Sequence, residues 1–376
     1  MKCMSLFSNI GVGEAYLDKI GIEVVVANEL VRRRANLYSQ IYPQANMICG
    51  DITDHRIYNK LIEEGIKQKI DIIKATPPCQ GMSNAGQKRK WDPRNNLIIP
   101  VIGIITTVRP KYAFIENVST LLVTKISHKG QEILISDLIG RKLSEYYHIN
   151  IYTIDTKDYS VPQFRERAII LFTRRDQRKI WTIPPKDKKI VTMKDAIGSL
   201  SIVDPFVKDI SCSELKKLFP KYYERKAAAQ RISKWHNPPH HIRRQVEIMM
   251  RTPTGCSAFD NKIYKPRKAN GELVRGYKNT YKRQNWDTPA YTVTMDNRKI
   301  SSQNNVHPGR YLGKNKRNEE LYSDPRALTL YEIMKIMTIP DNWPVPNNVS
   351  QPFLRSVIGE GIPPLFVKKT FQELIK

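Results

Sequence analysis

The first half of the chain alternates short apolar runs with longer segments of helical spacing, and this alternation most constrains the fold. Strands that alternate with helices form parallel sheets whose two faces are covered by the helices. We therefore expect an α/β domain built on a doubly wound, mostly parallel, Rossmann-like sheet. The predicted strands cover residues 2–7, 22–27, 46–49, 70–74, 112–115, 148–154 and 168–172, and the predicted helices cover residues 12–20, 29–41, 58–67, 97–108 and 135–145.

A single thiol follows the fourth predicted strand. Cys79 comes directly after two prolines, Pro77 and Pro78, at the end of this strand. Each proline fixes its own φ and disfavours a helical start, so the chain direction at Cys79 is constrained. The simplest interpretation of a lone cysteine is a small buried hydrophobe. A thiol at a rigid strand-to-loop turn favours a nucleophile instead.

Charged side chains stand at the ends of two further predicted strands. Glu116 and Asn117 follow residues 112–115, and Arg165 and Arg167 precede the last predicted strand. Residues two apart on a strand share a face, so we expect both guanidiniums on one side. A structural ion pair for Glu116 and ordinary surface arginines are the alternatives. With the thiol, these groups indicate nucleophilic catalysis on a flat polar substrate.

The order of these motifs resembles that of the cytosine-C5 DNA methyltransferases, the AdoMet-dependent enzymes of bacterial restriction-modification systems (AdoMet, S-adenosylmethionine). Pro-Cys-Gln, Glu-Asn-Val and Gln-x-Arg-x-Arg follow one another as they do in that family. Each match alone is weak, but the ordered set is specific and extends over nearly the whole chain. Further matching segments are residues 7–13, 288–294, 326–329 and 359–364.

The resemblance implies a role for each group. Cys79 would attack C6 of cytosine, Glu116 would contact N3 and the 4-amino group, and Arg167 would bond O2. Arg165 would brace the site or a nearby phosphate, and Asn117 would hold the catalytic loop in register. A base inside a duplex cannot reach such a pocket, so it must be flipped out.

The polar run at residues 80–96 is predicted to be a mobile loop that closes over DNA. It contains glycines and several basic residues. A surface loop without function is the alternative. By resemblance, the residues that contact DNA or fill the vacated space are Gln80, Ser83, Asn84, Ala85 and Gln163.

The implied cofactor is AdoMet, and no metal is implied. By resemblance, Glu29 binds the ribose hydroxyls, Asp51 accepts from the adenine amino group, and Glu360 accepts from the methionine ammonium. A carboxylate at a helix start is the alternative for Glu29, and an Asx-turn or N-cap is the alternative for Asp51. Asn9 and Val12 replace glycines usual in the family loop. The expected cofactor residues are Phe7, Ser8, Asn9, Ile10, Gly11, Glu29, Leu30, Asp51, Ile52, Pro78, Leu97 and Glu360.

A change of composition and pattern after Trp181 predicts two domains. Residues 1–184 plus 352–376 form the predicted AdoMet-binding catalytic domain, and residues 185–351 form a smaller target-recognition domain. The second region is basic, contains interleaved aromatics and lacks the strand–helix rhythm. The chain carries 62 Lys and Arg against 36 Asp and Glu, a formal net charge of +26. Such an excess favours a polyanion partner, here double-stranded DNA.

The cysteines and the first residues of the chain disfavour several other classes of protein. The five cysteines form no Cys-x-x-Cys pair, which disfavours zinc and a disulfide framework. The first residues lack a signal-peptide core, and no apolar run reaches membrane-spanning length. We expect a soluble, cytoplasmic bacterial protein, monomeric and associated with DNA.

The sequence therefore predicts a DNA cytosine-C5 methyltransferase, paired by analogy with a separate restriction endonuclease. A tRNA cytosine-C5 methyltransferase is the alternative within the same chemistry. A catalytically inactive, DNA-binding regulatory relative is an alternative from another class, although the four catalytic side chains are all present. Amino-methylating DNA enzymes follow the prolines with an aromatic residue, which this chain lacks. The recognition sequence cannot be predicted.

Overall fold

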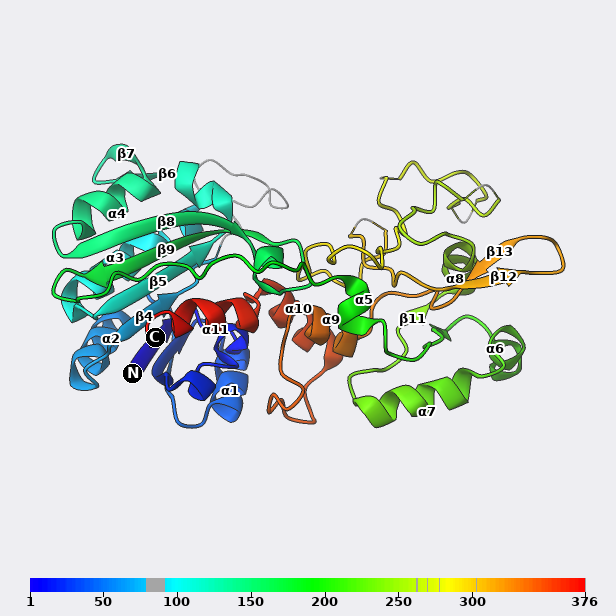
Figure 1. The fold of residues 1–376 in the computed structure, drawn as a ribbon, viewed down its shortest axis with the longest axis horizontal. Helices are drawn as coiled ribbons and strands as arrows, with labels where there is room; N and C mark the ends of the chain where they lie inside the picture. The colour runs from blue at the N-terminus through cyan, green and yellow to red at the C-terminus, as the bar shows by residue number, and fades with distance from the viewer. Residues whose placement is uncertain (79–91, 262, 269, 277, 302, 376) are drawn as a thin grey trace.

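The computed structural model has a sheet-based lobe and a second lobe of short helices and loops (Figure 1). It describes residues 1–78, 92–261, 263–268, 270–276, 278–301 and 303–375. Cys79, Gln80, Ser83, Asn84 and Ala85 lie outside the described residues.

The first lobe is built on a seven-stranded sheet with the order β3-β2-β1-β4-β5-β9-β8. β1 to β5 are parallel, and β9 runs antiparallel to both β5 and β8. The strand order reverses at β1, which lies between β2 and β4, and ligands of such sheets bind outside the carboxyl ends at this point. The strands are β1 Lys2–Leu6, β2 Glu23–Glu29, β3 Asn46–Cys49, β4 Ile72–Ala75, β5 Tyr112–Asn117, β8 Tyr147–Asp155 and β9 Glu166–Arg174.

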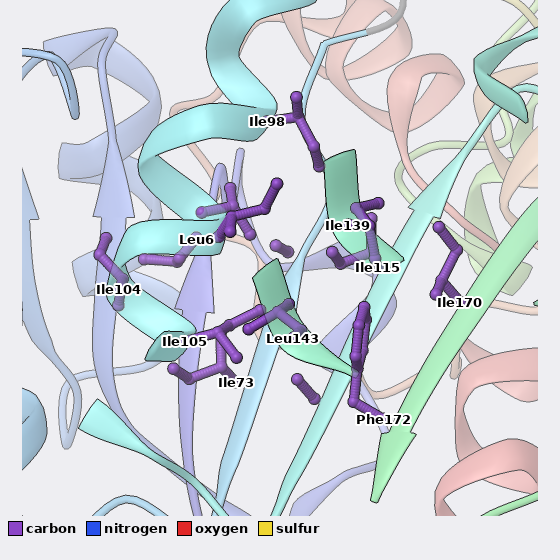
Figure 2. Packing of buried hydrophobic residues seen from close by; sticks show 14 of the residues in the cluster. Leu6, Ile73, Ile98, Ile104, Ile105, Ile115, Ile139, Leu143, Ile170 and Phe172 are labelled. Atoms are coloured by element: carbon purple, nitrogen blue, oxygen red, sulfur yellow. The ribbon is translucent and has the colours of Figure 1, made fainter. Parts of the chain in front are cut away.

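Helices cover both faces of this sheet because successive strand residues point to opposite sides. On one face Ile73 and Ile115 pack against α3 and α4, as Figure 2 shows. On the other face their neighbours Ile72 and Phe114 pack with Phe371 of α11. The helices are α1 Arg32–Ile41, α2 His55–Lys67, α3 Ile98–Val108, α4 Ile135–Leu143 and α11 Pro364–Gln372.

The predicted doubly wound α/β class is confirmed, with three local differences. The helix expected at residues 12–20 is two 3₁₀ turns, Val12–Glu14 and Asp18–Ile20. β5 continues through Asn117, so Glu116 lies within the strand instead of after it. A hairpin that the sequence analysis did not predict, β6 Lys125–His128 and β7 Gln131–Leu134, precedes α4.

Buried charge organises the interior of the second lobe. The guanidinium of Arg326 is fully buried and donates to both oxygens of Glu332 and to Asp324. The fully buried Arg283 donates to the carbonyls of Met249 and His307. The elements of this lobe are α5 Met193–Ile197, β10 Phe206–Val207, α6 Cys212–Leu218, α7 Tyr222–Ile232, β11 His240–His241, α8 Arg243–Met250, β12 Tyr311–Lys314, β13 Glu320–Tyr322, α9 Leu330–Ile336 and α10 Gln351–Glu360.

One apolar cluster joins the two lobes. Ile10 and Leu37 of the first lobe pack in the same cluster as Ile197 of α5, Ile333 of α9 and Ile358 of α10. The domain boundaries at residues 184/185 and 351/352 therefore stay a prediction. Within the described ranges, no helix combines the length and apolar character needed to cross a membrane, and no cluster of three potential metal ligands occurs.

Candidate active site

A carboxylate and a guanidinium meet at the polar edge of the sheet. The Nε of Arg167 on β9 lies 2.8 Å from Oε1 of Glu116 on β5, and both side chains are largely buried. The antiparallel pairing of these strands places Asn117 opposite Ala168, so the last residues of β5 adjoin the first of β9. The pair presents an acceptor and donors side by side, as recognition of a flat heterocycle requires.

Asn117 connects this edge to the segment that leads to Cys79. Its buried amide donates to the carbonyl of Pro77 at 3.0 Å, and its oxygen accepts from the backbone N–H of Val118 at 2.8 Å. On the opposite side, the hydroxyl of Thr76 donates to the carbonyl of Phe7 at 3.2 Å. Residues 76 and 77 are thus fixed both to β5 and to the loop after β1.

Arg165 and Arg167 contact different groups. Arg165 is only 3% exposed and donates to the carbonyls of Val293 at 2.9 Å and Gly361 at 2.8 Å. It also donates to the carbonyl of Gly359 at 3.2 Å. Of the two predicted roles for Arg165, these contacts correspond to bracing, because the guanidinium joins β9 to segments almost 130 and 200 residues away.

Gln163, a predicted DNA-contact residue, has a side chain that is fully buried in the structure, and its contact with DNA stays a prediction. Its amide nitrogen lies 3.0 Å from the sulfur of Met337, and its oxygen accepts from the backbone N–H of Val293 at 2.9 Å. The backbone of Gln163 forms a parallel bridge with Ala290, and the hydroxyl of Thr292 donates to the carbonyl of Phe164. Gln163 therefore holds the 288–294 segment against the first lobe.

The loop after β1 adopts a left-handed backbone at three positions. Phe7, Asn9 and Gly11 have φ values of 56°, 52° and 78°. At Gly11 a Cβ would lie 2.2 Å from the ring of Tyr42, so glycine is required there. Asparagine tolerates this conformation better than most residues, which explains how Asn9 replaces a glycine. Ser8 is also buried, and its hydroxyl donates to the carbonyl of Asn28.

Two carboxylates stand at the adjacent ends of β2 and β3. Glu29 is largely buried and accepts from the backbone N–H groups of Asn9 at 3.0 Å and Val31 at 2.9 Å. Asp51 is exposed and accepts from the N–H and hydroxyl of Thr53, which is the Asx-turn expected as its alternative. The turn leaves Asp51 at the surface, so the structural role and a binding role are compatible.

Apolar and unsatisfied polar groups complete this edge and fit a ligand with polar and apolar parts, such as AdoMet. The side chain of Leu30 is 60% exposed beside Glu29, and Pro78 and Leu97 are half-buried. The Oδ1 of Asn9 is buried and has no hydrogen-bond partner among the described residues, so it is available to a donor.

The side chains of Ile10 and Ile52, two of the predicted cofactor residues, are enclosed by protein, and their contact with the cofactor stays a prediction. Ile10 is fully buried in the cluster that joins the lobes, and Ile52 is 2% exposed in the core beneath the sheet edge. Both side chains pack in apolar clusters beneath the loops that carry them.

Glu360 is already paired with a cation. Both of its oxygens accept from the guanidinium of Arg34 on α1, at 2.7 and 3.0 Å. The amide of Asn9 donates to the carbonyl of Val357 at 3.2 Å and lies 3.5 Å from Glu360. The end of α10 is therefore bound to the loop after β1 and to α1.

Sequence reasoning missed a buried polar network beneath the loop after β1. The carboxylate of Glu14 is fully buried, accepts from the hydroxyls of Ser5 and Tyr38, and lies 3.5 Å from the Nζ of buried Lys74. Lys74 interrupts an otherwise apolar strand immediately before the cysteine turn. A lysine inside such a strand is the signal that could have revealed the network, since a buried lysine requires a partner.

Together, the topological switch at β1, the acidic ends of β2 and β3, and the Glu–Arg pair at the same edge define an AdoMet-dependent methyltransferase fold. The chain belongs to the family of C-5 cytosine-specific DNA methylases, whose family model matches residues 1–376. It is therefore a DNA cytosine-C5 methyltransferase, as the sequence motifs predict, and the tRNA alternative is not favoured.

Named relatives agree with this assignment. The chain is 40% identical to the Type II methyltransferase M1.HgaI of Avibacterium volantium, over 99% of this chain and 97% of that protein. It is 24% identical to the Type II methyltransferase M1.HphI of Haemophilus parahaemolyticus, over 100% of this chain and 88% of that one.

Solved structures show the same fold. A putative DNA modification methyltransferase encoded within an Escherichia coli prophage matches with a TM-score of 0.68 and 19% identity, covering 100% of this chain and 98% of its own. Dnmt2 of S. pombe matches with a TM-score of 0.57 and 13% identity, over 100% and 98% of the two chains.

Proposed function

We propose that this chain transfers a methyl group from AdoMet to C5 of cytosine in a specific sequence of double-stranded DNA, as the protective methylase of a restriction-modification system. The Glu116–Arg167 pair carries the proposal, because Asn117 beside it bonds Pro77, two residues before Cys79. The family and the Type II relatives support the substrate, and the net charge of +26 suits a polyanion.

Cys79 is the proposed nucleophile. Its thiolate adds to C6, and the electrons of the C5–C6 double bond shift toward C4 and N3. C5 thereby becomes enamine-like and nucleophilic. Glu116 carries a proton that it donates to N3, it accepts from the 4-amino group, and Arg167 binds O2, as negative charge develops in the ring. After C5 has gained the methyl group, its hydrogen leaves as a proton to a base, the double bond re-forms and the thiolate departs. Arg165 and Asn117 position these groups.

The loop after β1 and the ends of β2 and β3 are the proposed cofactor site. Glu29 and Asp51 supply acceptors, Leu30 supplies an exposed apolar surface, and Asn9 supplies an unsatisfied acceptor. When bound, AdoMet supplies an electrophilic methyl group on its sulfonium sulfur. Because Arg34 neutralises Glu360, that carboxylate can lie near the cofactor's own carboxylate with less repulsion.

Residues 185–351 are proposed to read the DNA sequence, with the target base flipped toward the Glu116–Arg167 pair. The segment with Gln80, Ser83, Asn84 and Ala85 is proposed to close over the DNA and fill the vacated space. We propose that the protein acts as a cytoplasmic monomer and that any cognate endonuclease acts separately.

Substitution of the proposed nucleophile tests this function. We expect Cys79→Ser to abolish methylation of host DNA, read by bisulfite sequencing of cells that express the chain, while AdoMet binding by the purified protein persists. Cys212→Ser, at an exposed cysteine in the second lobe, is the matched control and should retain the wild-type pattern. Normal methylation by Cys79→Ser, or methylated tRNA with unmodified DNA, would contradict the proposal.

A further inference from the structure

A cleft of about 760 Å³ opens on the second lobe, between the β10–β11 pair, α7 and the first turns of α10. Its lining carries the cations Lys226, Arg298 and Arg355, the imidazole of His240, and the aromatic rings of Phe206 and Tyr222. Among the described residues that line it, none is an aspartate or glutamate. A cleft with cations and no carboxylate has a positive potential that low-dielectric walls concentrate.

Arg355 lines this cleft as a buried cation, and no carboxylate of the described residues lies within ion-pairing distance of it. It is 5% exposed, and it donates to the carbonyl of Leu328 at 2.7 Å and to Oδ1 of Asn297 at 3.2 Å, both neutral acceptors. No ion pair to Arg355 occurs within the ranges that the structure covers. Burial lowers the pKa of Arg355 to about 10; attraction from the carboxylate of Glu332 opposes this shift, and repulsion from Arg298 adds to it.

Arg326, in the same lobe, is a buried guanidinium whose charge is compensated by carboxylates. It donates to two carboxylates, those of Asp324 and Glu332, which raise the pKa of Arg326 despite its burial. A buried guanidinium destabilises the fold unless nearby acceptors or carboxylates compensate its charge. Arg355 differs from Arg326 because no carboxylate pairs with it directly and because it lines an open cleft, where an anion from outside can add to the attraction of Glu332.

The rim adds three features that favour an anion. Arg298 is exposed at the mouth of the cleft, and the exposed ring of His240 packs on Phe206 with centroids 4.9 Å apart. The ten-residue helix α10 begins here, and its N-cap Ser350 makes no side-chain capping bond. The helix dipole at such a start favours an anion, although Pro352 in the first turn has no backbone N–H to donate.

We propose that this cleft is a phosphate-binding site, with the guanidinium of Arg355 at its base and Arg298 and Lys226 at its rim. A guanidinium matches two phosphate oxygens at once, and a lysine adds a point charge. The phosphate can be a phosphodiester of the substrate DNA, which rests on the proposed function, or part of a free phosphorylated molecule, which does not.

Titration of the DNA-free protein with inorganic phosphate at constant ionic strength tests the site itself. We expect saturable binding by calorimetry, weakened at least about tenfold in Arg298→Ala/Lys226→Ala. Arg141→Ala/Lys142→Ala, which removes the same charge from exposed positions on α4, should bind as wild type does. Arg355→Lys keeps the charge but loses the paired geometry and should also weaken binding, and thermal melting checks that each variant is folded.

The source of the phosphate follows from DNA affinity measured at several salt concentrations. Each lost phosphate contact lowers the slope of log affinity against log salt by about 0.9. A slope lower by about 1–2 in Arg298→Ala/Lys226→Ala, relative to the α4 control, identifies the DNA backbone. An unchanged slope in the rim variant, together with its weakened binding of inorganic phosphate, identifies a free phosphorylated ligand. Absence of saturable phosphate binding by wild type, or equal binding by the rim variant, would overturn the site, whatever the methylation activity.

Discussion

The two lobes are stabilised in different ways. The first is a regular sheet whose strands alternate apolar residues between two helix-covered faces, with polar side chains gathered at the strand ends. The second has short elements and two-residue strands, and its interior contains the fully buried guanidiniums of Arg283 and Arg326. Figure 1 shows this contrast between long parallel elements and irregular chain.

This difference suits the two tasks that the proposed function assigns to the lobes, catalysis to the first and reading of DNA to the second. Covalent catalysis requires fixed positions for a few groups, and strand ends of a packed sheet provide them. A surface that reads DNA requires loops of varied shape, whose backbone carbonyls need donors inside the lobe. Buried arginines supply several donors each, so they hold loops together where no sheet exists. Four predictions test this division.

Removal of the carboxylate charge at Glu116 should have the largest effect, because the proposed function assigns Glu116 to the contact with the reacting base. We expect Glu116→Gln to lower the single-turnover methylation rate by a factor of about 10²–10⁴, with DNA affinity little changed. Glu132→Gln, at an exposed position on β7, is the control and should keep the wild-type rate. Equal methylation rates for the two variants would mean that Glu116 takes no part in methyl transfer.

Loss of the central guanidinium should destabilise the second lobe. We expect Arg326→Met to lower the free energy of unfolding by roughly 3–5 kcal/mol, because it removes the guanidinium that the buried carboxylates of Asp324 and Glu332 share. Urea unfolding measures the change. Arg317→Met, at an exposed position between β12 and β13, should change stability by less than about 0.5 kcal/mol. A small effect at Arg326 would mean that apolar packing alone holds this lobe.

Acid should destabilise the second lobe through two buried histidines. Burial lowers the pKa of His241 and of His307 to about 4, and each ring accepts a backbone N–H, from Ala327 and Gly309 respectively. Since the folded pKa lies below the unfolded value near 6.5, the unfolded state binds protons first as the pH falls. Stability is complete above about pH 6.5 and declines toward pH 4, by on the order of 2 kcal/mol per histidine at pH 5.

Urea unfolding at pH 7 and pH 5 measures this decline. His241→Gln/His307→Gln should show a smaller loss between the two pH values than wild type, whereas His55→Gln on α2 should behave as wild type. An equal loss in all three proteins would assign the acid sensitivity to other groups.

The smallest expected effect concerns the connection between β5 and the catalytic turn. Asn117→Ala removes the hydrogen bond to Pro77, and we expect about 1 kcal/mol of lost stability and about a tenfold lower kcat with unchanged AdoMet affinity. Asn150→Ala on β8 removes a comparable bond to the carbonyl of Trp181 and should lose similar stability without the kinetic effect. Equal kcat values for the two variants would mean that Asn117 does not position Cys79.

Much of the first lobe was predictable because strand and helix periodicities are local properties of the sequence. The seven strands of the sheet match the predicted segments within a few residues. The partners of Arg165 and Gln163 were not predictable, because they lie some 130–195 residues along the chain. The same limit applies to Glu14 and Lys74, whose interaction depends on the sheet that brings them together.

The second lobe offered fewer local signals, and some were overlooked. Thr192 with Asp195 and Ser211 with Glu214 form capping boxes at the starts of α5 and α6. A serine or threonine followed three residues later by an acidic residue is a helix-start signal that the sequence displays. The arginine network gives no such periodic signal, since its members meet only in the folded lobe.

Trapping of the enzyme on duplex DNA that contains 5-fluorocytosine tests the central claim most directly. Fluorine at C5 cannot leave as a proton leaves, so the adduct between the enzyme and the methylated base should persist. With AdoMet present, we predict a covalent complex stable to denaturation, with mass spectrometry locating the bond at the sulfur of Cys79. Failure to form the complex under conditions where normal DNA is methylated, or attachment through another cysteine, would contradict the account.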